Sequence, residues 1–282
     1  MIDIRDLSFS YTKSPFITDV TFHVAKGEIF GFLGPSGAGK STLQKILTGQ
    51  LPAYGGSVRV LDAEVKTHKR DFYERIGVDF EFPALYDKLT ARENLQFFAS
   101  LYSVKTRPAD ALLASLVLLP DADKRVSDYS KGMKSRLSFL RALVNDPDIL
   151  FLDEPTSGLD PANARLMKDL ILEEKANGKT VILTTHNMQD AQELCDRVAF
   201  IVGGSVKALD TPHALIMQKG AGVVRYTYME DGREQSGACS IQATGADALL
   251  QRLLKAGRIS TIHSAEPNLG DIFMDVTGRA LE

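Results

Sequence analysis

The sequence has few cysteines, no long apolar run and little net charge. Two cysteines, Cys195 and Cys239, are too few for a disulfide framework, so a reducing, cytosolic compartment is expected. The longest apolar stretch, residues 111–119, is too short to cross a bilayer, and residues 1–6 are charged from the start, so no secretory signal peptide is expected. The formal net charge of −3, with both signs mixed along the chain, does not indicate a nucleic-acid-binding surface, and no nucleic-acid partner is expected.

What is present is an ordinary globular composition with an α/β pattern. The chain has 282 residues, 44% hydrophobic and 24% charged, and this length favours one large domain followed by a smaller one. Apolar strands alternate with helical patterns over residues 1–220, except that about 83–145 is helical without strands, as in an inserted subdomain. Glycines near residue 220 predict a linker, and residues 221–282 predict a small α+β appendage without a catalytic constellation.

A glycine-rich stretch organises the first domain. It fits the phosphate-binding pattern G-x-x-x-x-G-K-[ST], between a predicted buried strand over residues 28–33 and a predicted helix over 41–48. Its residues are Gly34, Pro35, Ser36, Gly37, Ala38, Gly39, Lys40, Ser41 and Thr42. A turn that leads into a helix aims backbone N–H groups at one point, and glycines let the backbone wrap an anion. A chance match in a turn is the alternative, and the strand-to-helix context argues against it. We therefore expect nucleotide binding, with Lys40 on the β- and γ-phosphates and the Ser41 hydroxyl on Mg²⁺.

Polar residues follow two further predicted strands. Asp153 and Glu154 end an apolar run that begins at residue 149, and His186 follows the run 180–185. Ligands of open α/β sheets bind at the carboxyl ends of the strands. Asp153 suits the Mg²⁺ shell, and Glu154 suits a general base for an attacking water. The alternative for the two carboxylates is a solvated strand end, and the alternative for His186 is a purely structural role. Because these residues are expected beside the phosphate loop, the more specific hypothesis is a hydrogen bond from His186 to the γ-phosphate.

Two weaker signals complete the set. Ser130 and Gly132 precede a helix, which predicts a second exposed helix N-terminus and hence a second anion site, although most such starts are only caps. Tyr11 ends the first predicted strand, where an aromatic ring could stack on a base. Taken alone, local packing of this tyrosine would be the preferred interpretation.

In their order and spacing these motifs resemble those of the ATP-binding-cassette (ABC) ATPases, over about residues 1–220. Residues 34–42 are similar to the Walker A loop and 149–154 to Walker B with its catalytic glutamate. Residues 157–160 are similar to the D-loop, His186 to the switch histidine and Tyr11 to the adenine-stacking aromatic. The segment similar to the family's signature motif, called the signature segment below, consists of Ser130, Lys131, Gly132 and Met133 after Tyr129.

The chain departs from the usual family pattern at three positions. Lys131 stands where glycine is usual and Met133 where glutamine is usual, and this form of the signature segment is similar to that of exporter ATPases of the drug- and antibiotic-resistance type. Glu81 stands where the family's Q-loop usually has glutamine. A glutamate keeps the oxygen ligand but adds negative charge beside Glu154.

The resemblance implies a P-loop ABC ATPase core, a mixed sheet flanked by helices, with ATP and Mg²⁺ as ligands. It implies catalytic roles for Glu154, His186 and Glu81, metal ligation by Ser41, Asp153 and Glu81, and a link between two sites through Asp160. It implies a head-to-tail dimer, of two identical chains or with a closely similar second ATPase subunit.

The function expected from this resemblance is the energising subunit of an ABC exporter. It would work at the cytoplasmic, inner face of the cell membrane, peripherally docked on a separate integral membrane permease through a groove near Phe82–Tyr86. The permease would select the transported substrate. Two alternatives are a soluble ABC ATPase that acts on nucleic acid or ribosomes, and a nucleotide-gated binding module with little turnover, which Glu81 makes worth keeping.

Overall fold

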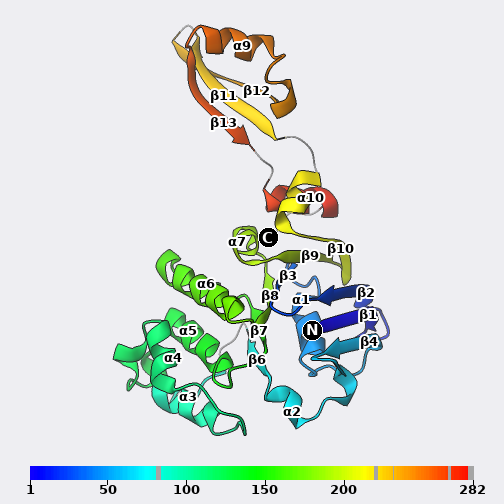
Figure 1. Cartoon of the computed structure of the whole chain (residues 1–282), viewed down its shortest axis with the longest axis vertical. Coiled ribbons are helices and arrows are strands. Elements are labelled where there is room, and N and C mark those ends of the chain that lie inside the picture. The colour runs from blue at the N-terminus through cyan, green and yellow to red at the C-terminus, as the bar shows by residue number, and fades with distance from the viewer. Residues whose placement is uncertain (81–83, 219–221, 231, 266–267, 279–282) are drawn as a thin grey trace. The chain divides into compact units, whose positions relative to one another are not determined.

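The computed structural model describes residues 1–80, 84–218, 222–230, 232–265 and 268–278, and it divides the chain into two compact units (Figure 1). The first unit runs over Met1–Thr211 and the second over Pro212–Ala280. The division therefore precedes helix α8 (Pro212–Gln218), whereas the sequence suggested a linker after this helix, near residue 220.

The first unit contains two sheets. The antiparallel sheet has the order β2 (Ile17–Val24), β1 (Ile2–Phe9), β4 (Gly55–Val60) and β5 (Ala63–Glu64). The larger sheet has the order β10 (Ser205–Asp210), β9 (Arg197–Val202), β3 (Ile29–Leu33), β8 (Thr180–Thr185), β7 (Ile149–Asp153) and β6 (Ile76–Asp79). In the larger sheet only β10 is antiparallel to its neighbour.

The central strands of the larger sheet place the candidate site. Every residue of β3, β7 and β8 is buried, as expected of parallel strands covered on both faces. In their register, Leu33 lies opposite Thr185 and Asp153 opposite Thr184. Since the three strands are parallel neighbours, their carboxyl ends meet at one edge of the sheet, as the sequence predicted.

Helices flank the larger sheet. Helices α1 (Lys40–Leu47), α6 (Pro161–Ala176) and α7 (Met188–Leu194) follow its strands β3, β7 and β8. The short η1 (Val65–Thr67) and α2 (Arg70–Tyr73) lead from β5 of the antiparallel sheet to β6. Asp160 caps α6, with Pro161 in its first position.

The segment between β6 and β7 is helical. It contains α3 (Ala91–Ala99), α4 (Ala109–Ser115), η2 (Leu119–Asp121), η3 (Val126–Asp128) and α5 (Lys131–Ala142). Thr90 and Glu93 form a capping box at the start of α3. Figure 1 shows α3, α4 and α5 gathered on the side of β7 away from the antiparallel sheet, and α5 packs on the edge strand β6.

The second unit contains a three-stranded antiparallel sheet and helices. The sheet has the order β12 (Arg233–Ser240), β11 (Val223–Glu230) and β13 (Ile259–Ala265). The remaining elements are η4 (Ile241–Ala243), α9 (Ala248–Lys255) and α10 (Leu269–Thr277), and α10 packs against α8. Alternate residues of β11, which are Val224, Tyr226 and Tyr228, form a core with Leu250 and Leu253 of α9. Among all the described residues of both units, no helix is both long and apolar enough to cross a membrane.

Candidate nucleotide site

The loop between β3 and α1 has a backbone that glycine permits. Gly37 and Gly39 have φ values of +75° and +112°, in the region that L side chains rarely adopt. At Gly34 an added Cβ would lie 2.2 Å from the carbonyl oxygen of Ile201, so no larger residue fits there. The helix that follows begins at Lys40, which directs its first N–H groups toward the loop.

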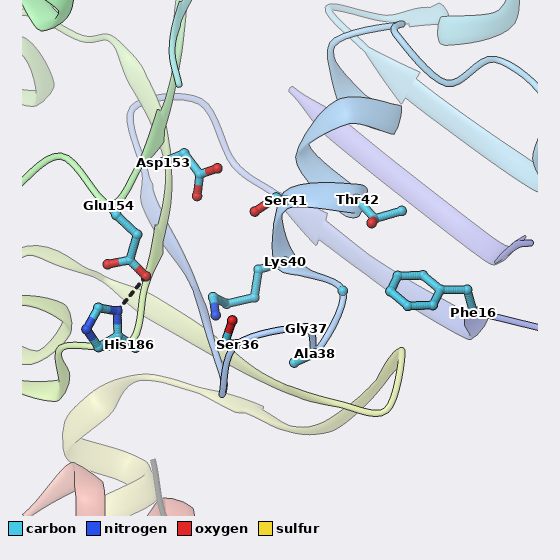
Figure 2. Close-up of a pocket in the computed structure, with 11 residues that line it drawn as sticks. Phe16, Ser36, Gly37, Ala38, Lys40, Ser41, Thr42, Asp153, Glu154 and His186 are labelled. Atoms are coloured by element: carbon cyan, nitrogen blue, oxygen red, sulfur yellow. Dashed lines mark hydrogen bonds and ion pairs between the residues drawn. The ribbon is translucent and has the colours of Figure 1, made fainter. Parts of the chain in front are cut away.

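This loop opens into a cavity of about 270 Å³ that the sequence-predicted residues share (Figure 2). We call it the phosphate-loop cavity. Its lining consists of Phe16, Ser36, Gly37, Ala38, Gly39, Lys40, Ser41, Thr42, Asp153, Glu154 and His186. The ends of β3, β7 and β8 thus contribute to one space, and the carboxylates lie across it from the helix N-terminus.

The Lys40 side chain is held inside the loop. Its Nζ donates to the carbonyl oxygens of Gly34, at 2.6 Å, and Pro35, at 3.1 Å. The side chain is buried, with 8% of the residue exposed, so its charge acts at short range in a site with little water. Gly34 and Pro35 do not line the cavity, and their carbonyls position the lysine that does.

Two threonines of β8 hold the adjacent carboxylates. The Thr184 hydroxyl donates to Asp153, and the Thr185 hydroxyl donates to Glu154 Oε2 at 3.1 Å. Glu154 Oε1 lies 2.8 Å from Nδ1 of His186. These hydroxyls were not predicted from the sequence, although two threonines at the end of an apolar strand were the available signal.

The backbone of Glu154 is unusual. Its φ is +51°, a left-handed conformation that is rare for residues other than glycine, asparagine and aspartate. The peptide is retained by a hydrogen bond from the Glu154 N–H to the Thr184 carbonyl at 3.0 Å. Such outliers cluster at functional sites, because there the surroundings hold a conformation that the chain alone disfavours.

Tyr11 lies next to the cavity and Phe16 lines it. The Tyr11 ring packs edge-on against Phe16, with centroids 5.3 Å apart, and its hydroxyl lies 3.0 Å from the Thr42 hydroxyl. Tyr11 is 55% exposed, which leaves ring surface available to a ligand. Phe16 was not predicted, since nothing in the residues before β2 marks a loop aromatic as a cavity wall.

The signature segment lies at a different place. Ser130 caps α5, and its hydroxyl accepts a hydrogen bond from the Met133 N–H at 3.2 Å. None of the four residues of this segment, all of which are described, lines the phosphate-loop cavity. Lys131 instead lines a second cavity, of about 360 Å³, which reaches Asp153 and Glu154 from the side of α5. One chain therefore presents two separate helix N-termini to ligands.

Asp160 is the remaining predicted site residue that the structure describes. Asp160 caps α6 by accepting a hydrogen bond from the Asn163 N–H at 3.0 Å. The hydrogen bond from the Asn163 side chain, and then this backbone bond, lower the pKa of the Asp160 carboxyl. Glu81 and Phe82 lie outside the described residues.

A further buried carboxyl lies beside the site. Asp79 ends β6 and lines the second cavity, and it accepts a hydrogen bond from the Ser138 hydroxyl at 2.6 Å. Burial raises the pKa of Asp79 to about 7, more than the hydrogen bond from Ser138 lowers it. The sequence signal was a single aspartate in an otherwise apolar strand.

The described residues fit a metal that is shared with a phosphate ligand. None of them form a cluster of three or more histidine, cysteine, aspartate or glutamate side chains. Ser41 and Asp153 nevertheless line one cavity, with a hydroxyl and a carboxylate directed at the same space. Mg²⁺ in nucleotide sites is typically held by one or two such groups, with phosphate and water oxygens as its other ligands.

Comparison with known proteins gives a consistent set of relatives. The family model described as "ABC transporter" matches residues 17–157. A fluoroquinolones export ATP-binding protein of Mycobacterium tuberculosis is 50% identical over 284 residues, which cover 100% of this chain and 94% of that protein. A Nod factor export ATP-binding protein I of Rhizobium meliloti is 39% identical over 298 residues, which cover 100% of this chain and 89% of that protein.

Solved structures share the fold of the first unit. An ATP-binding subunit of an ABC transporter superposes with a TM-score of 0.71 at 30% identity, covering 78% of this chain and 93% of that one. A dimeric ATP-binding cassette, in a post-hydrolysis state bound to ADP and Pi, superposes with a TM-score of 0.66 at 25% identity, covering 75% of this chain and 98% of that one.

Proposed function

The chain belongs to the ABC transporter family as the ATP-binding, ATP-hydrolysing subunit of an exporter, and from that premise we propose which residues carry its chemistry. The observation that carries the proposal is the phosphate-loop cavity, which brings Lys40 together with Asp153, Glu154 and His186. The phosphates of ATP lie along the loop, where backbone N–H groups and the Lys40 ammonium neutralise their charge. The exposed ring of Tyr11, beside Phe16, supplies a surface for the adenine.

Glu154 acts as the general base for the water that attacks the γ-phosphate. Its carboxylate is mostly buried, accepts a hydrogen bond from Thr185 and contacts His186. These contacts fix the position of the carboxylate and limit the groups with which it can exchange a proton. His186 is 52% exposed at its side chain and can also donate to the γ-phosphate. Positioning and electrostatics supply most of the catalysis in phosphoryl transfer, which suits a site whose groups are fixed before the substrate arrives.

Mg²⁺ would be held by the Ser41 hydroxyl and the Asp153 carboxylate, with Glu81 as a further oxygen ligand from outside the described residues. When bound, the ion neutralises charge that develops on the β- and γ-phosphate oxygens. The hydrogen bond from Thr184 keeps one Asp153 oxygen occupied and leaves the other for this role.

Two copies of the chain close on ATP. The signature segment is a helix N-terminus that does not line the phosphate-loop cavity of its own chain, so a two-fold pair can place it on the γ-phosphate held by the partner. Asp160 lies in the loop between Glu154 and α6 and would meet the second site across the pair. ATP stabilises the closed pair, and hydrolysis removes the bridging charge, which biases the pair toward opening.

A groove in the first unit suits the membrane permease. A cavity of about 430 Å³ is lined mainly by apolar side chains, which include Phe80, Ala84, Phe98 and Leu101. Its charged members are Arg70, Glu74 and Arg141. An apolar groove with a few polar groups fits the apolar face of a permease helix. Ala84 belongs to the predicted docking region. We therefore place the subunit at the cytoplasmic face of the membrane, with the permease selecting the substrate, and the mycobacterial relative makes fluoroquinolone-like compounds the first class to test.

The decisive experiment compares Mg²⁺-dependent ATPase activity in the wild type, Glu154→Gln and Glu173→Gln. Glu173 is an exposed residue of α6 and serves as the matched control. We expect Glu154→Gln to lose at least about 100-fold in kcat, and to form an ATP-dependent dimer by light scattering, while Glu173→Gln behaves as wild type. Retained hydrolysis in Glu154→Gln would refute the assignment of the base, and a monomer at saturating ATP would refute the closed pair.

A further inference from the structure

A side-chain hydrogen bond connects the loop after Glu154 to helix α7. The Thr156 hydroxyl, two residues beyond Glu154, donates to Asp190 Oδ2 at 2.5 Å. Thr156 is half-buried, and Asp190 is buried, with 6% of the residue exposed. Because little water reaches this contact, the hydrogen bond is stronger than one at the surface and is costly to leave unmade.

Lys168 of α6 balances the charge of Asp190. Its Nζ lies 3.2 Å from Asp190 Oδ1, so the two oxygens of this carboxylate accept from two different elements. Lys168 also pairs with Glu193. A buried carboxylate needs such a partner, since an unpaired charge away from water is strongly unfavourable. An asparagine here would present an N–H₂ group in place of one oxygen and would turn it toward one of the two donors.

Asp190 also belongs to the helix that begins directly after His186. Asn187 caps this helix, and its side-chain oxygen accepts a hydrogen bond from the Asp190 N–H at 3.2 Å. The Asn187 N–H donates to the Thr185 hydroxyl at 2.9 Å, and that hydroxyl donates to Glu154. The segments that follow Glu154 and His186 are therefore joined at Asp190, in addition to the direct contact between these two side chains.

This junction helps to maintain the strained backbone of Glu154. A φ of +51° persists only where the surroundings hold it. On one side, the Glu154 N–H donates to the Thr184 carbonyl. On the other side, the Ser157 N–H donates to the Glu154 carbonyl at 3.0 Å, and the Thr156 side chain is held by Asp190. The proposed base thus lies between two fixed points of the chain.

From this geometry, and resting on the proposed function, we infer that Asp190 is a positioning residue for ATP hydrolysis. It acts through Thr156 on the loop that carries Glu154, and Lys168 balances its charge. Asp190 is a described residue that does not line the phosphate-loop cavity, so its effect on the nucleotide is indirect. The inference predicts a change in kcat rather than in KM for ATP.

The test measures the ATPase kinetics of Thr156→Val, Thr156→Ser and Glu193→Gln. Thr156→Val keeps the shape but removes the donor, and it should lower kcat about tenfold, because displacement of a positioned group is costly. KM for ATP should stay within about twofold. Thr156→Ser keeps the hydroxyl and should retain at least about half of the wild-type kcat.

Glu193→Gln is the matched control. It changes the other partner of Lys168 and leaves the hydrogen bond between Thr156 and Asp190 in place. Because Glu193 is a partly exposed residue that forms only a peripheral ion pair, this variant should change kcat by less than about twofold.

A double-mutant cycle shows whether Asp190 acts through Thr156. Asp190→Asn should lower kcat about fivefold by itself but less than about twofold in the Thr156→Val background, because residues that act through each other are not additive. Equal losses in both backgrounds would overturn the inference. A Thr156→Ser variant as slow as Thr156→Val would also overturn it, and so would a rise in KM that accounts for the loss.

Unfolding curves of every variant ensure that equal amounts of folded protein are compared. If Glu154→Gln abolishes turnover while Thr156→Val hydrolyses ATP at the wild-type rate, the proposed function stands and this inference alone fails. Retained turnover in Glu154→Gln would instead refute the proposed base, and this inference with it.

Discussion

Replacement of Asp79 by asparagine should change how stability depends on pH. Asparagine keeps an oxygen acceptor for Ser138 and nearly the same volume but cannot ionise. In the folded protein the pKa of Asp79 is about 7, against an ordinary value of 3.8. The folded state therefore retains a proton that the unfolded chain has released, and the free energy of unfolding falls as the pH rises between these two values.

The magnitude follows from the two pKa values. The stability that the protonated Asp79 carboxyl contributes is fully present below pH 3.8. It is lost as the pH rises through about 7, where this carboxyl ionises in the folded protein as well. One pKa unit corresponds to about 1.4 kcal/mol. Between pH 5 and pH 8 the free energy of unfolding of the wild type should therefore fall by about 2.5 kcal/mol more than that of Asp79→Asn. The variant should thus be the more stable protein at the higher pH.

Urea unfolding followed by circular dichroism at several pH values measures this difference. Asp123→Asn is the control: Arg92 lowers the pKa of the exposed Asp123 carboxyl, so this group is ionised in both states throughout the range and should add no pH dependence. Parallel curves for the wild type and Asp79→Asn from pH 5 to pH 8 would show that Asp79 is ionised in the folded protein, and the reasoning from burial would be refuted.

Two further substitutions test the backbone beside the phosphate-loop cavity and the ion pair between Arg107 and Glu174. Gly204→Ala should weaken ATP binding at least about tenfold, since a Cβ would lie 1.7 Å from the Phe16 carbonyl oxygen beside the phosphate-loop cavity. Gly203→Ala carries a similar backbone strain, with φ of +56° against +75°, but has open space around it and should not weaken binding. Equilibrium dialysis with labelled ATP measures both, and equal affinities would contradict the steric argument. Arg107→Ala should lower the free energy of unfolding by about 3 kcal/mol, because it leaves the buried carboxylate of Glu174 unpaired. In urea unfolding, the double variant with Glu174→Gln should recover part of that loss. A single variant as stable as the wild type would show that the pair contributes little.

The sequence predicted that the site's main groups lie together because ligands of open α/β sheets bind where the carboxyl ends of parallel strands meet. Lys40, Asp153 and His186 each follow an apolar run, and apolar runs of this kind form parallel strands whose ends share an edge. The same rules do not specify register. The contacts of Thr184 and Thr185 with the two carboxylates depend on which residues of β7 and β8 lie opposite one another, and a shift of one residue would exchange their faces.

Features that depend on tertiary packing were less predictable. Helix α4 ends at Ser115, although the residues that follow it up to 119 are mostly apolar, because Leu116 leaves the helical region with φ of −115° and Val117 has φ of +56°. The grouping of α8 with the second unit depends on its contact with α10, far along the chain. The role of Phe16 depends on a loop conformation, for which the local sequence carries no periodic signal.

The left-handed backbone of Glu154 has a consequence for selection. A glutamate with φ of +51° costs roughly 1–2 kcal/mol relative to a residue that adopts this conformation freely. Glycine or asparagine at position 154 would relieve that strain and would remove the proposed base at the same time. A screen of random variants for thermal stability alone would therefore enrich inactive proteins at this one codon, and a screen for turnover would return the strained residue. Stability and activity therefore favour different residues at position 154, so the residue recovered there shows which of the two properties a screen has selected.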